Sequence, residues 1–163
     1  MRILLAVDIQ NLFCGCRDTY GRRARVDYRK LIEAAVPCSA RPQALARAYL
    51  VGKRKQDDSA FIAMLESFGY TVRKRVLEEQ GADWDTGMVV ETMRDIDDFD
   101  RLVLASGDGD FESLVRQLQA RGKHVTVMAF PKCLNERLAT AADKVVKLEQ
   151  QMFVWKGGNG DRK

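Results

Sequence analysis

Short apolar runs alternate with amphipathic stretches along the whole chain. Residues 3–7 form a continuous apolar run, which is typical of a strand that is buried on both faces. Further strands are predicted over residues 46–51, 71–77, 101–105 and 124–129, and a short last one at Val145 and Val146. Strands separated by helices favour right-handed crossovers. The pattern therefore predicts an α/β fold, a three-layer α/β/α sandwich around a parallel sheet.

Helices are expected between these strands, where apolar residues recur at three- and four-residue spacing. They are predicted from residue 26 to about 36, after Asp57 or Asp58, after Asp83, over residues 111–121 and over residues 135–142. One domain is expected over residues 1–150. Residues 151–163 form a C-terminal extension that we expect to be disordered from about residue 157.

Composition narrows the class of protein. The 163 residues, 46% of them hydrophobic and 31% charged, fit one soluble domain with its own core. No apolar run is long enough to span a bilayer, and no signal-peptide pattern is seen. We therefore expect a cytoplasmic protein without a membrane partner.

The four cysteines are expected to be reduced thiols in that compartment. They are Cys14, Cys16, Cys38 and Cys133. Cys14 and Cys16 suggest zinc, but a single residue separates them instead of the usual two. Ordinary thiols are the preferred interpretation.

Charge is unevenly distributed, although the net charge is only +4. Residues 12–30 carry an excess of Arg and Lys, whereas residues 83–110 are rich in Asp. Such segregation is expected when a basic rim surrounds an acidic site. The sequence therefore predicts a polyanionic ligand beside a cluster of carboxylates.

The basic rim is assigned to two segments. Residues 12–25 are expected to form a long loop after the first strand, in which Arg22, Arg23 and Arg25 bind phosphates. Phe13 and Tyr20 of this loop are candidates for base stacking. The second segment follows the second strand and comprises Lys53, Arg54 and Lys55. A solvated loop is the alternative for the first segment, and protection of a sheet edge explains residues 73–75 equally well.

Acidic residues follow two predicted strands directly. Asp8 ends the first strand, with Asn11 three residues later, and Asp108 and Asp110 follow the fourth strand. If these strands are neighbours, their ends lie about 5 Å apart. Asp85 is expected on a loop that faces the same edge. Carboxylates brought together in this way favour a divalent cation, and all-oxygen ligands suit magnesium or manganese better than zinc.

Two details qualify this acidic site. Gly107 and Gly109 are expected to allow a sharp turn and a close approach to a ligand. Asp110 and Asp83 also lie where helices begin, so a helix N-cap is the competing role for each.

Phosphodiester hydrolysis is the chemistry that such a metal site suits, because the metal orients water and stabilises charge on the phosphate. The chain lacks a Gly-rich phosphate loop that ends in Lys-Ser or Lys-Thr, and it lacks the third glycine of a dinucleotide fingerprint. Its single histidine, His124, is predicted far from the strand ends, which excludes a Ser-His-Asp triad.

Four segments resemble NYN domains of the LabA-like group, over about residues 3–148. These segments are Val7-Asp8-Ile9-Gln10-Asn11, Gly81-Ala82-Asp83-Trp84-Asp85-Thr86-Gly87, Ser106-Gly107-Asp108-Gly109-Asp110-Phe111, and the stretch from Leu138 to Leu148. The resemblance implies a PIN-like fold with strand order 3-2-1-4-5. It also implies magnesium or manganese as the cofactor, and nuclease activity mainly on RNA.

The resemblance also implies roles for single residues. Asp8, Asp85 and Asp108 would be the central acidic residues and Asp110 a further metal ligand. Asn11 would contact the substrate or a metal-bound water, and Ser106 is assigned to the substrate.

The chain departs from the family pattern at two positions. Gln80 stands where Lys is frequent, and Glu91 stands where Asp is frequent. We expect Glu91 to support the site or the fold without binding the metal itself.

The sequence thus predicts a metal-dependent ribonuclease whose partner is RNA, with DNA as a second candidate, acting as a monomer or a homodimer. Two alternatives stay open. One is a Toprim-like domain, although Toprim sites usually carry Glu where this chain has Asp8. The other is a nucleic-acid-binding or adaptor module with a residual metal site.

Overall fold

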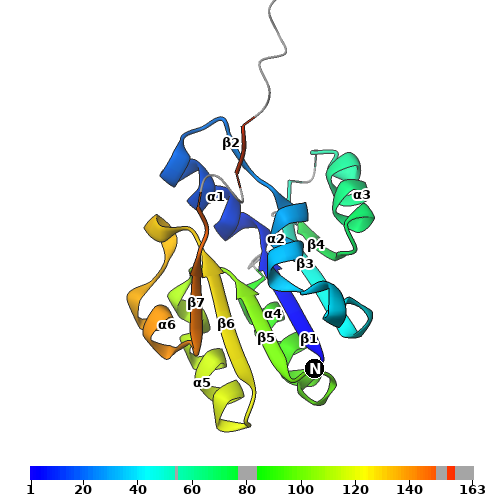
Figure 1. Ribbon diagram of the computed structural model, residues 1–163. Helices are drawn as coiled ribbons and strands as arrows, with labels where there is room; N and C mark the ends of the chain where they lie inside the picture. Colours follow the sequence, from blue (N-terminus) through cyan, green and yellow to red (C-terminus); the bar gives the residue numbers. More distant parts are fainter. Residues whose placement is uncertain (54, 77–83, 150–153, 157–163) are drawn as a thin grey trace, which may run out of the picture.

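A parallel six-stranded sheet forms the centre of the protein (Figure 1). The structure is a computed structural model and describes residues 1–53, 55–76, 84–149 and 154–156. The strand order is β4-β3-β1-β5-β6-β7. The strands are β1 (Ile3–Asp8), β3 (Ala44–Gly52), β4 (Thr71–Val76), β5 (Arg101–Ala105), β6 (His124–Ala129) and β7 (Lys144–Lys147). Every pair of neighbours in this sheet is parallel.

The predicted fold class is confirmed, and the strand order differs from the expected one in detail. When β1, β3, β4, β5 and β6 are numbered 1 to 5 along the chain, they lie in the order 3-2-1-4-5. The additional strand β7 extends the sheet beyond β6. A second, two-stranded sheet was not expected. It pairs β2 (Ala24–Val26) antiparallel with β8 (Val154–Lys156).

Helices cover both faces of the main sheet. The first face carries α1 (Ile9–Tyr20), α2 (Tyr28–Ala35) and α3 (Ser59–Ser67), and the second carries α4 (Asp85–Arg94), α5 (Glu112–Ala120) and α6 (Glu136–Ala141). Short 3₁₀ helices occupy Cys38–Gln43, Ile96–Asp98, Gly109–Phe111 and Pro131–Cys133. Figure 1 shows α1 and α2 in front of the sheet and α4 behind it.

The central strand β1 shows why the apolar run at the start of the chain is continuous. Leu5 and Val7 pack into the core on the first face, whereas Leu4 and Ala6 pack into the core on the second. All four are almost completely buried. Side chains of a strand alternate between its faces, so a strand covered on both sides must be apolar throughout.

The winding of the chain reverses at β1. The chain proceeds from β1 through β3 to β4 on one side, and later from β5 through β6 to β7 on the other. Ligands of open α/β sheets bind beyond the carboxyl ends of the strands at such a reversal. The strand register places Asp8 beside Tyr49, and Val7 beside Ala105. The residues that follow β1 and β5 therefore meet at this edge.

The expected loop over residues 12–25 is wrong, because most of it is helix α1. Asp8 caps this helix by accepting a hydrogen bond from the backbone N–H of Asn11 at 3.0 Å. Ile9, Leu12 and Cys16 recur on one face of the helix and are buried. That stripe is narrow and includes a cysteine, so a pattern of large apolar residues does not reveal it.

Other element ends agree closely with the prediction. The N-terminus of α3 is held by Asp57, whose carboxylate accepts from the Ser59 N–H at 2.9 Å. Asp58 instead pairs with Lys74 at 3.1 Å. Asp83, expected to cap α4, lies outside the described residues, and so does the tail from residue 157.

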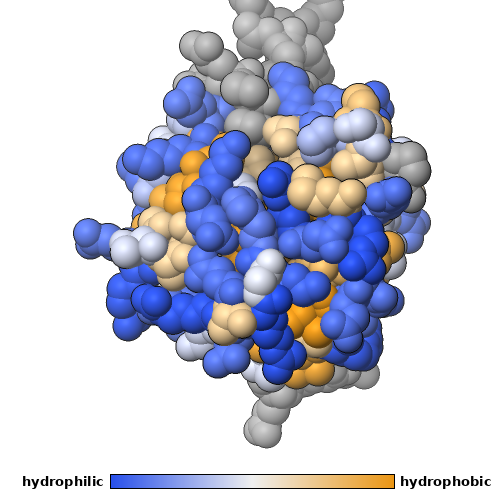
Figure 2. Space-filling model, turned by 60° about the horizontal axis from the view of Figure 1, so that its bottom comes forward, coloured by the Kyte–Doolittle hydropathy of each residue, from blue (hydrophilic) through white to orange (hydrophobic). Residues whose placement is uncertain are grey.

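The amino end of the sheet comes forward in Figure 2, where a largely hydrophilic surface is broken by small apolar patches. The carboxyl end carries the site described next. Among the described helices, none has both the length and the apolar character that crossing a bilayer requires.

Candidate metal centre

Three carboxylates converge at the carboxyl end of the sheet. Asp85 begins α4, and Asp108 and Asp110 lie on the turn that follows β5. One oxygen of each lies within 4.8 Å of the others, and the described part of the chain holds no second group of this kind. Like charges so close together repel one another, and a divalent cation with oxygen ligands relieves that repulsion. The donor set therefore fits magnesium or manganese.

The turn after β5 excludes the helix N-cap role that was considered for Asp110. Asp108 caps the 3₁₀ helix Gly109–Phe111 by accepting a hydrogen bond from the backbone N–H of Asp110 at 3.0 Å. The side chain of Asp110 does not act as the cap and is exposed. Its carboxylate is thereby turned toward Asp85 and Asp108.

Asp8 is not one of the three converging carboxylates, although Ser106 links it to Asp108. Both oxygens of Asp8 have partners within the protein. One oxygen accepts from the Asn11 N–H at 3.0 Å, and the other accepts from the Ser106 hydroxyl at 3.1 Å. Burial raises the pKa of the Asp8 carboxyl above its ordinary value, and the negative charge of Asp108 raises it further. The two hydrogen bonds oppose this increase. Asp8 therefore adds negative charge to the site at a cost to the fold.

Two polar side chains join α1 to the turn after β5. The Ser106 hydroxyl accepts from the backbone N–H of Asp108 at 3.2 Å while it donates to Asp8. The side-chain amide oxygen of Asn11 accepts from the Gly107 N–H at 2.9 Å. Ser106 is completely buried, so its hydroxyl serves these two aspartates and not the substrate that the sequence analysis assigned to it.

The two glycines of this turn are needed for close packing. A Cβ at Gly107 would overlap the backbone carbonyl of Cys133, and one at Gly109 would lie 2.6 Å from the Asn135 side chain. Neither glycine has a positive φ. The turn therefore does not need glycine for a positive φ, and the expected close approach to a ligand stays a prediction. The glycines instead let residues 133–135 support the turn, and the Asn135 N–H donates to the Gly107 carbonyl at 2.9 Å.

Glu91 faces the sheet one and a half turns along α4 from Asp85. Its carboxylate accepts from the Tyr49 hydroxyl at 3.0 Å and lies 3.5 Å from Nε of Arg73 and 3.9 Å from Nη1 of Arg47. Burial and the charge of Glu91 together raise the pKa of Tyr49 to about 12. These contacts tie α4 to β3 and β4.

The basic residues of the proposed rim lie on exposed parts of the chain. Arg22 and Arg23 are exposed in the turn between α1 and β2. Arg25 is exposed in β2, and its Nη1 donates to the carbonyls of Arg22 at 2.9 Å and Ala24 at 3.0 Å. Lys53 and Lys55, after β3, are exposed too, and Arg54 lies outside the described residues.

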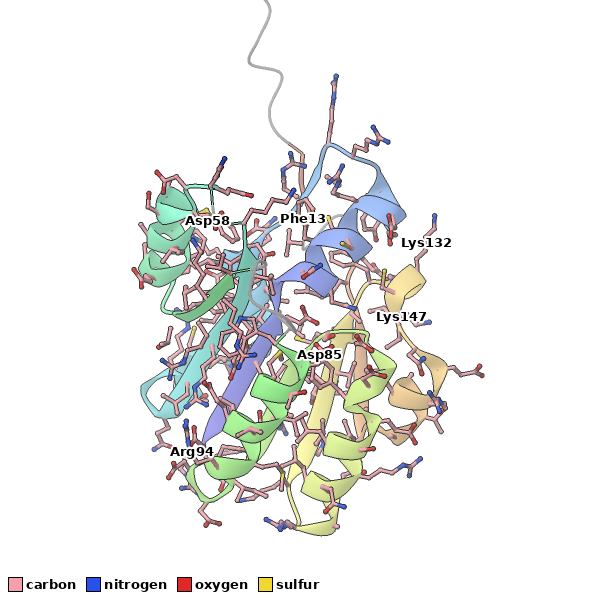
Figure 3. The ribbon with its side chains drawn as sticks, turned by 180° about the vertical axis from the view of Figure 1, so that it is seen from behind. Phe13, Asp58, Asp85, Arg94, Lys132 and Lys147 are labelled. Atoms are coloured by element: carbon pink, nitrogen blue, oxygen red, sulfur yellow. The ribbon has the colours of Figure 1, made fainter. Side chains whose placement is uncertain are left out.

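The two aromatic residues considered for base stacking differ. Tyr20 turns inward, where its hydroxyl donates to the Leu148 carbonyl at 3.2 Å and its ring packs edge-on against Phe130. Phe13 is 41% exposed, with the Arg17 guanidinium 5.0 Å from its ring centre. Figure 3 places Phe13 above Asp85, beyond the end of α4 that is opposite Arg94. Of the two, only Phe13 can stack a base.

The other residues considered from the sequence lie away from the cluster or apart from one another. His124 begins β6 beside Arg101, at the amino end of the sheet. All four cysteines are free thiols, with Cys14 exposed and Cys16 buried, so these two do not converge on a shared ligand.

One contact beside Asp85 was not predicted from the sequence. The Arg75 guanidinium lies over the Trp84 ring, 4.3 Å from its centre. Trp84 is fixed by a hydrogen bond from its indole N–H to the Leu50 carbonyl at 3.1 Å. An aromatic residue directly before Asp85 was a signal in the sequence, but its partner Arg75 belongs to the preceding strand, β4.

Comparisons with known proteins agree with this geometry. The sequence profile of the NYN domain matches residues 2–149. "Low amplitude and bright protein LabA" from Synechococcus elongatus is 34% identical over 107 residues, which is 59% of this chain and 58% of that protein. The match thus covers little more than half of LabA. A crystal structure of a protein of unknown function from Vibrio parahaemolyticus is 29% identical, with a TM-score of 0.78, and the match covers 93% of this chain and 95% of the other.

Proposed function

The chain belongs to the NYN domain family, whose fold is PIN-like and nuclease-like, and from this we propose that it is a metal-dependent nuclease acting on RNA. The observation that carries the proposal is the group formed by Asp85, Asp108 and Asp110. Membership of this family also removes the support for a Toprim-like domain.

The acidic residues would share the work of holding the cation. Asp85, Asp108 and Asp110 supply the three converging oxygens. We assign Asp8 to the same centre as a further negative group, held next to Asp108 through Ser106. When bound there, magnesium or manganese would orient a water molecule and stabilise the charge that develops on the phosphate.

The scaffold keeps these carboxylates together although they repel one another. Asn11 and Ser106 fix the turn after β5 against α1 through hydrogen bonds of 2.9 to 3.2 Å. Residues 133–135 support the other side of that turn. A site organised before the metal and substrate arrive loses less free energy in ordering them.

The basic rim supports a nucleic acid as substrate. Arg22, Arg23, Lys53 and Lys55 are exposed on segments that follow α1 and β3, and Phe13 is exposed on α1. Lys and Arg bind nucleic-acid phosphates whatever the base sequence, and an exposed aromatic ring stacks on unpaired bases. We propose RNA as the substrate, and DNA is the competing one.

Cleavage of a labelled RNA tests the proposal most directly. We expect cleavage with magnesium or manganese and its loss on chelation, because the cluster offers only oxygen ligands. A DNA of the same sequence tests the choice of substrate. Undiminished cleavage in excess EDTA would refute metal dependence. RNA binding without cleavage in either metal would instead favour a binding or adaptor module.

A further inference from the structure

Trp84 is held in a fixed position at the start of α4. Its indole N–H donates to the Leu50 carbonyl of β3, and its ring packs edge-on against Tyr49 with 5.1 Å between ring centres. Asp85 of the acidic cluster is the next residue. The position of the Trp84 ring is therefore coupled to that of a proposed metal ligand.

Gly87 creates the room for an arginine at this place. A Cβ at Gly87 would lie 2.7 Å from Cε3 of Trp84 and 3.2 Å from Nη2 of Arg75. Any larger residue at position 87 would displace the Trp84 ring or the Arg75 guanidinium. The guanidinium of Arg75 thus packs against the same turn that carries Asp85.

Two arginines of β4 face the same side of the sheet but contact different parts of α4. Arg73 and Arg75 are two residues apart, which places both side chains on the α4 face. Arg73 lies 3.5 Å from Glu91, well along α4. Arg75 lies over Trp84, the residue before Asp85, and against the first turn of α4 at Gly87. Of the two arginines, Arg75 is the one that packs against the turn in which Asp85 lies.

We propose that Arg75, held on the face of Trp84, binds the RNA phosphate that adjoins the scissile one. Stacking uses the face of a guanidinium, while its N–H groups point outward in the plane and match phosphate oxygens. A rigid ring behind the guanidinium reduces the side-chain entropy that is lost on binding. This inference rests on the proposed nuclease function and adds a substrate-binding residue to it.

The test compares Arg75→Gln with Arg73→Gln, a matched change on the same face of the same strand. Binding of a single-stranded RNA is measured in calcium across a salt series. Loss of one charge-assisted contact should weaken binding about tenfold and lower the log-log salt slope by about 0.7 for Arg75→Gln. Arg73→Gln should leave the slope unchanged. Equal slopes for both variants and the wild type would overturn the inference.

Cleavage kinetics separate a binding contact from a structural one. For Arg75→Gln we expect KM to rise about tenfold with kcat largely retained, because the contact is present in ground and transition states alike. Arg75→Lys should keep the salt slope. A fall in kcat together with weaker manganese binding would show that Arg75 only supports the acidic cluster, and would contradict the proposal.

A variant of the ring tests the role of Trp84. Trp84→Leu should raise KM in the same direction as Arg75→Gln, and the double variant should be no worse than Arg75→Gln alone. Independent effects that add would overturn the coupling between ring and guanidinium. If the wild type cleaves nothing in either metal, the nuclease proposal fails, whereas the calcium binding series still decides the role of Arg75.

Discussion

The two ends of the parallel sheet use aspartates in opposite ways. At the amino end, Asp100 accepts from the Arg2 side chain at 2.9 Å and from its backbone N–H at 2.8 Å. These bonds lower the pKa of Asp100 to about 2. At the carboxyl end, Asp8 is partly buried and linked through Ser106 to Asp108, and burial raises its pKa above the ordinary value. The surroundings of Asp100 favour its charged form, whereas the surroundings of Asp8 disfavour its charged form.

This contrast separates acids that serve the fold from acids that serve a ligand. The Arg2–Asp100 pair is about half exposed, so it contributes little to the free energy of unfolding. It does not destabilise the fold either. At the carboxyl end, burial and the negative charge of Asp108 disfavour the charged form of Asp8 in the metal-free protein. Groups held in an unfavourable environment by a well-packed scaffold are candidates for function, and here a cation would offset the repulsion.

The largest expected effect comes from exchanging one aspartate at each end. Asp108→Asn removes a negative ligand and keeps the shape, so RNA cleavage should fall by about 10²-fold or more. Asp100→Asn at the amino end should leave cleavage unchanged. Unfolding without metal should show Asp108→Asn to be as stable as the wild type or more stable, because repulsion is relieved. An active Asp108→Asn protein would remove this residue from the centre.

The next effect concerns arginines at the two ends. Arg22, Arg23 and Arg25 are exposed at the carboxyl end, whereas Arg2 is paired with Asp100. Replacing the first three with Ala should weaken RNA binding at every sequence. It should also lower the log-log salt slope by about 0.7 per contact, or about 2 in total.

Arg2→Ala is the matched control for that series and should leave the slope unchanged. The comparison is made by measuring affinity across a salt series in calcium. If the triple variant and the wild type have the same slope, residues 22–25 are only a solvated surface. The binding groove would then be sought around Lys53 and Lys55.

Much of the fold could be predicted from the sequence because the strands are buried on both faces. Such strands are continuous apolar runs, and Arg101–Ala105 and His124–Ala129 begin and end where the sequence predicted. Helix α1 could not be predicted in this way. Its buried face includes Gly15, which packs closely against Cys133, so its hydrophobic stripe is incomplete.

The acidic site was predictable to the extent that strand ends determine it. Asp108 and Asp110 follow β5 and Asp85 begins α4, and the topology alone brings these positions to one edge. Contacts that depend on side-chain direction were not predictable. The inward turn of Tyr20 requires a partner from a distant part of the chain, and the stacking of Arg75 on Trp84 joins a strand to the start of the next helix.

The smallest expected effect is on stability, and it has opposite pH dependence at the two ends. The folded pKa of Asp100 lies below its ordinary value of 3.8, so its contribution is present above pH 3.8 and is lost as pH falls toward 2. The folded pKa of Asp8 lies above 3.8, so the folded state gains relative stability below that pH. That gain is lost as pH rises through the folded pKa of Asp8.

Two variants make this difference measurable by urea unfolding in EDTA between pH 3 and pH 7. Asp8→Asn keeps an acceptor for the Asn11 N–H and can donate to the Ser106 hydroxyl, so it should fold and should gain stability over the wild type as pH rises. Asp100→Asn should instead be slightly less stable than the wild type at pH 7, and the deficit should shrink as pH falls. The two differences from the wild type should therefore have opposite sign at pH 7. A loss of stability in Asp8→Asn at pH 7 would show that its hydrogen bonds outweigh the burial of its charge, and the contrast between the two ends of the sheet would no longer hold for this residue.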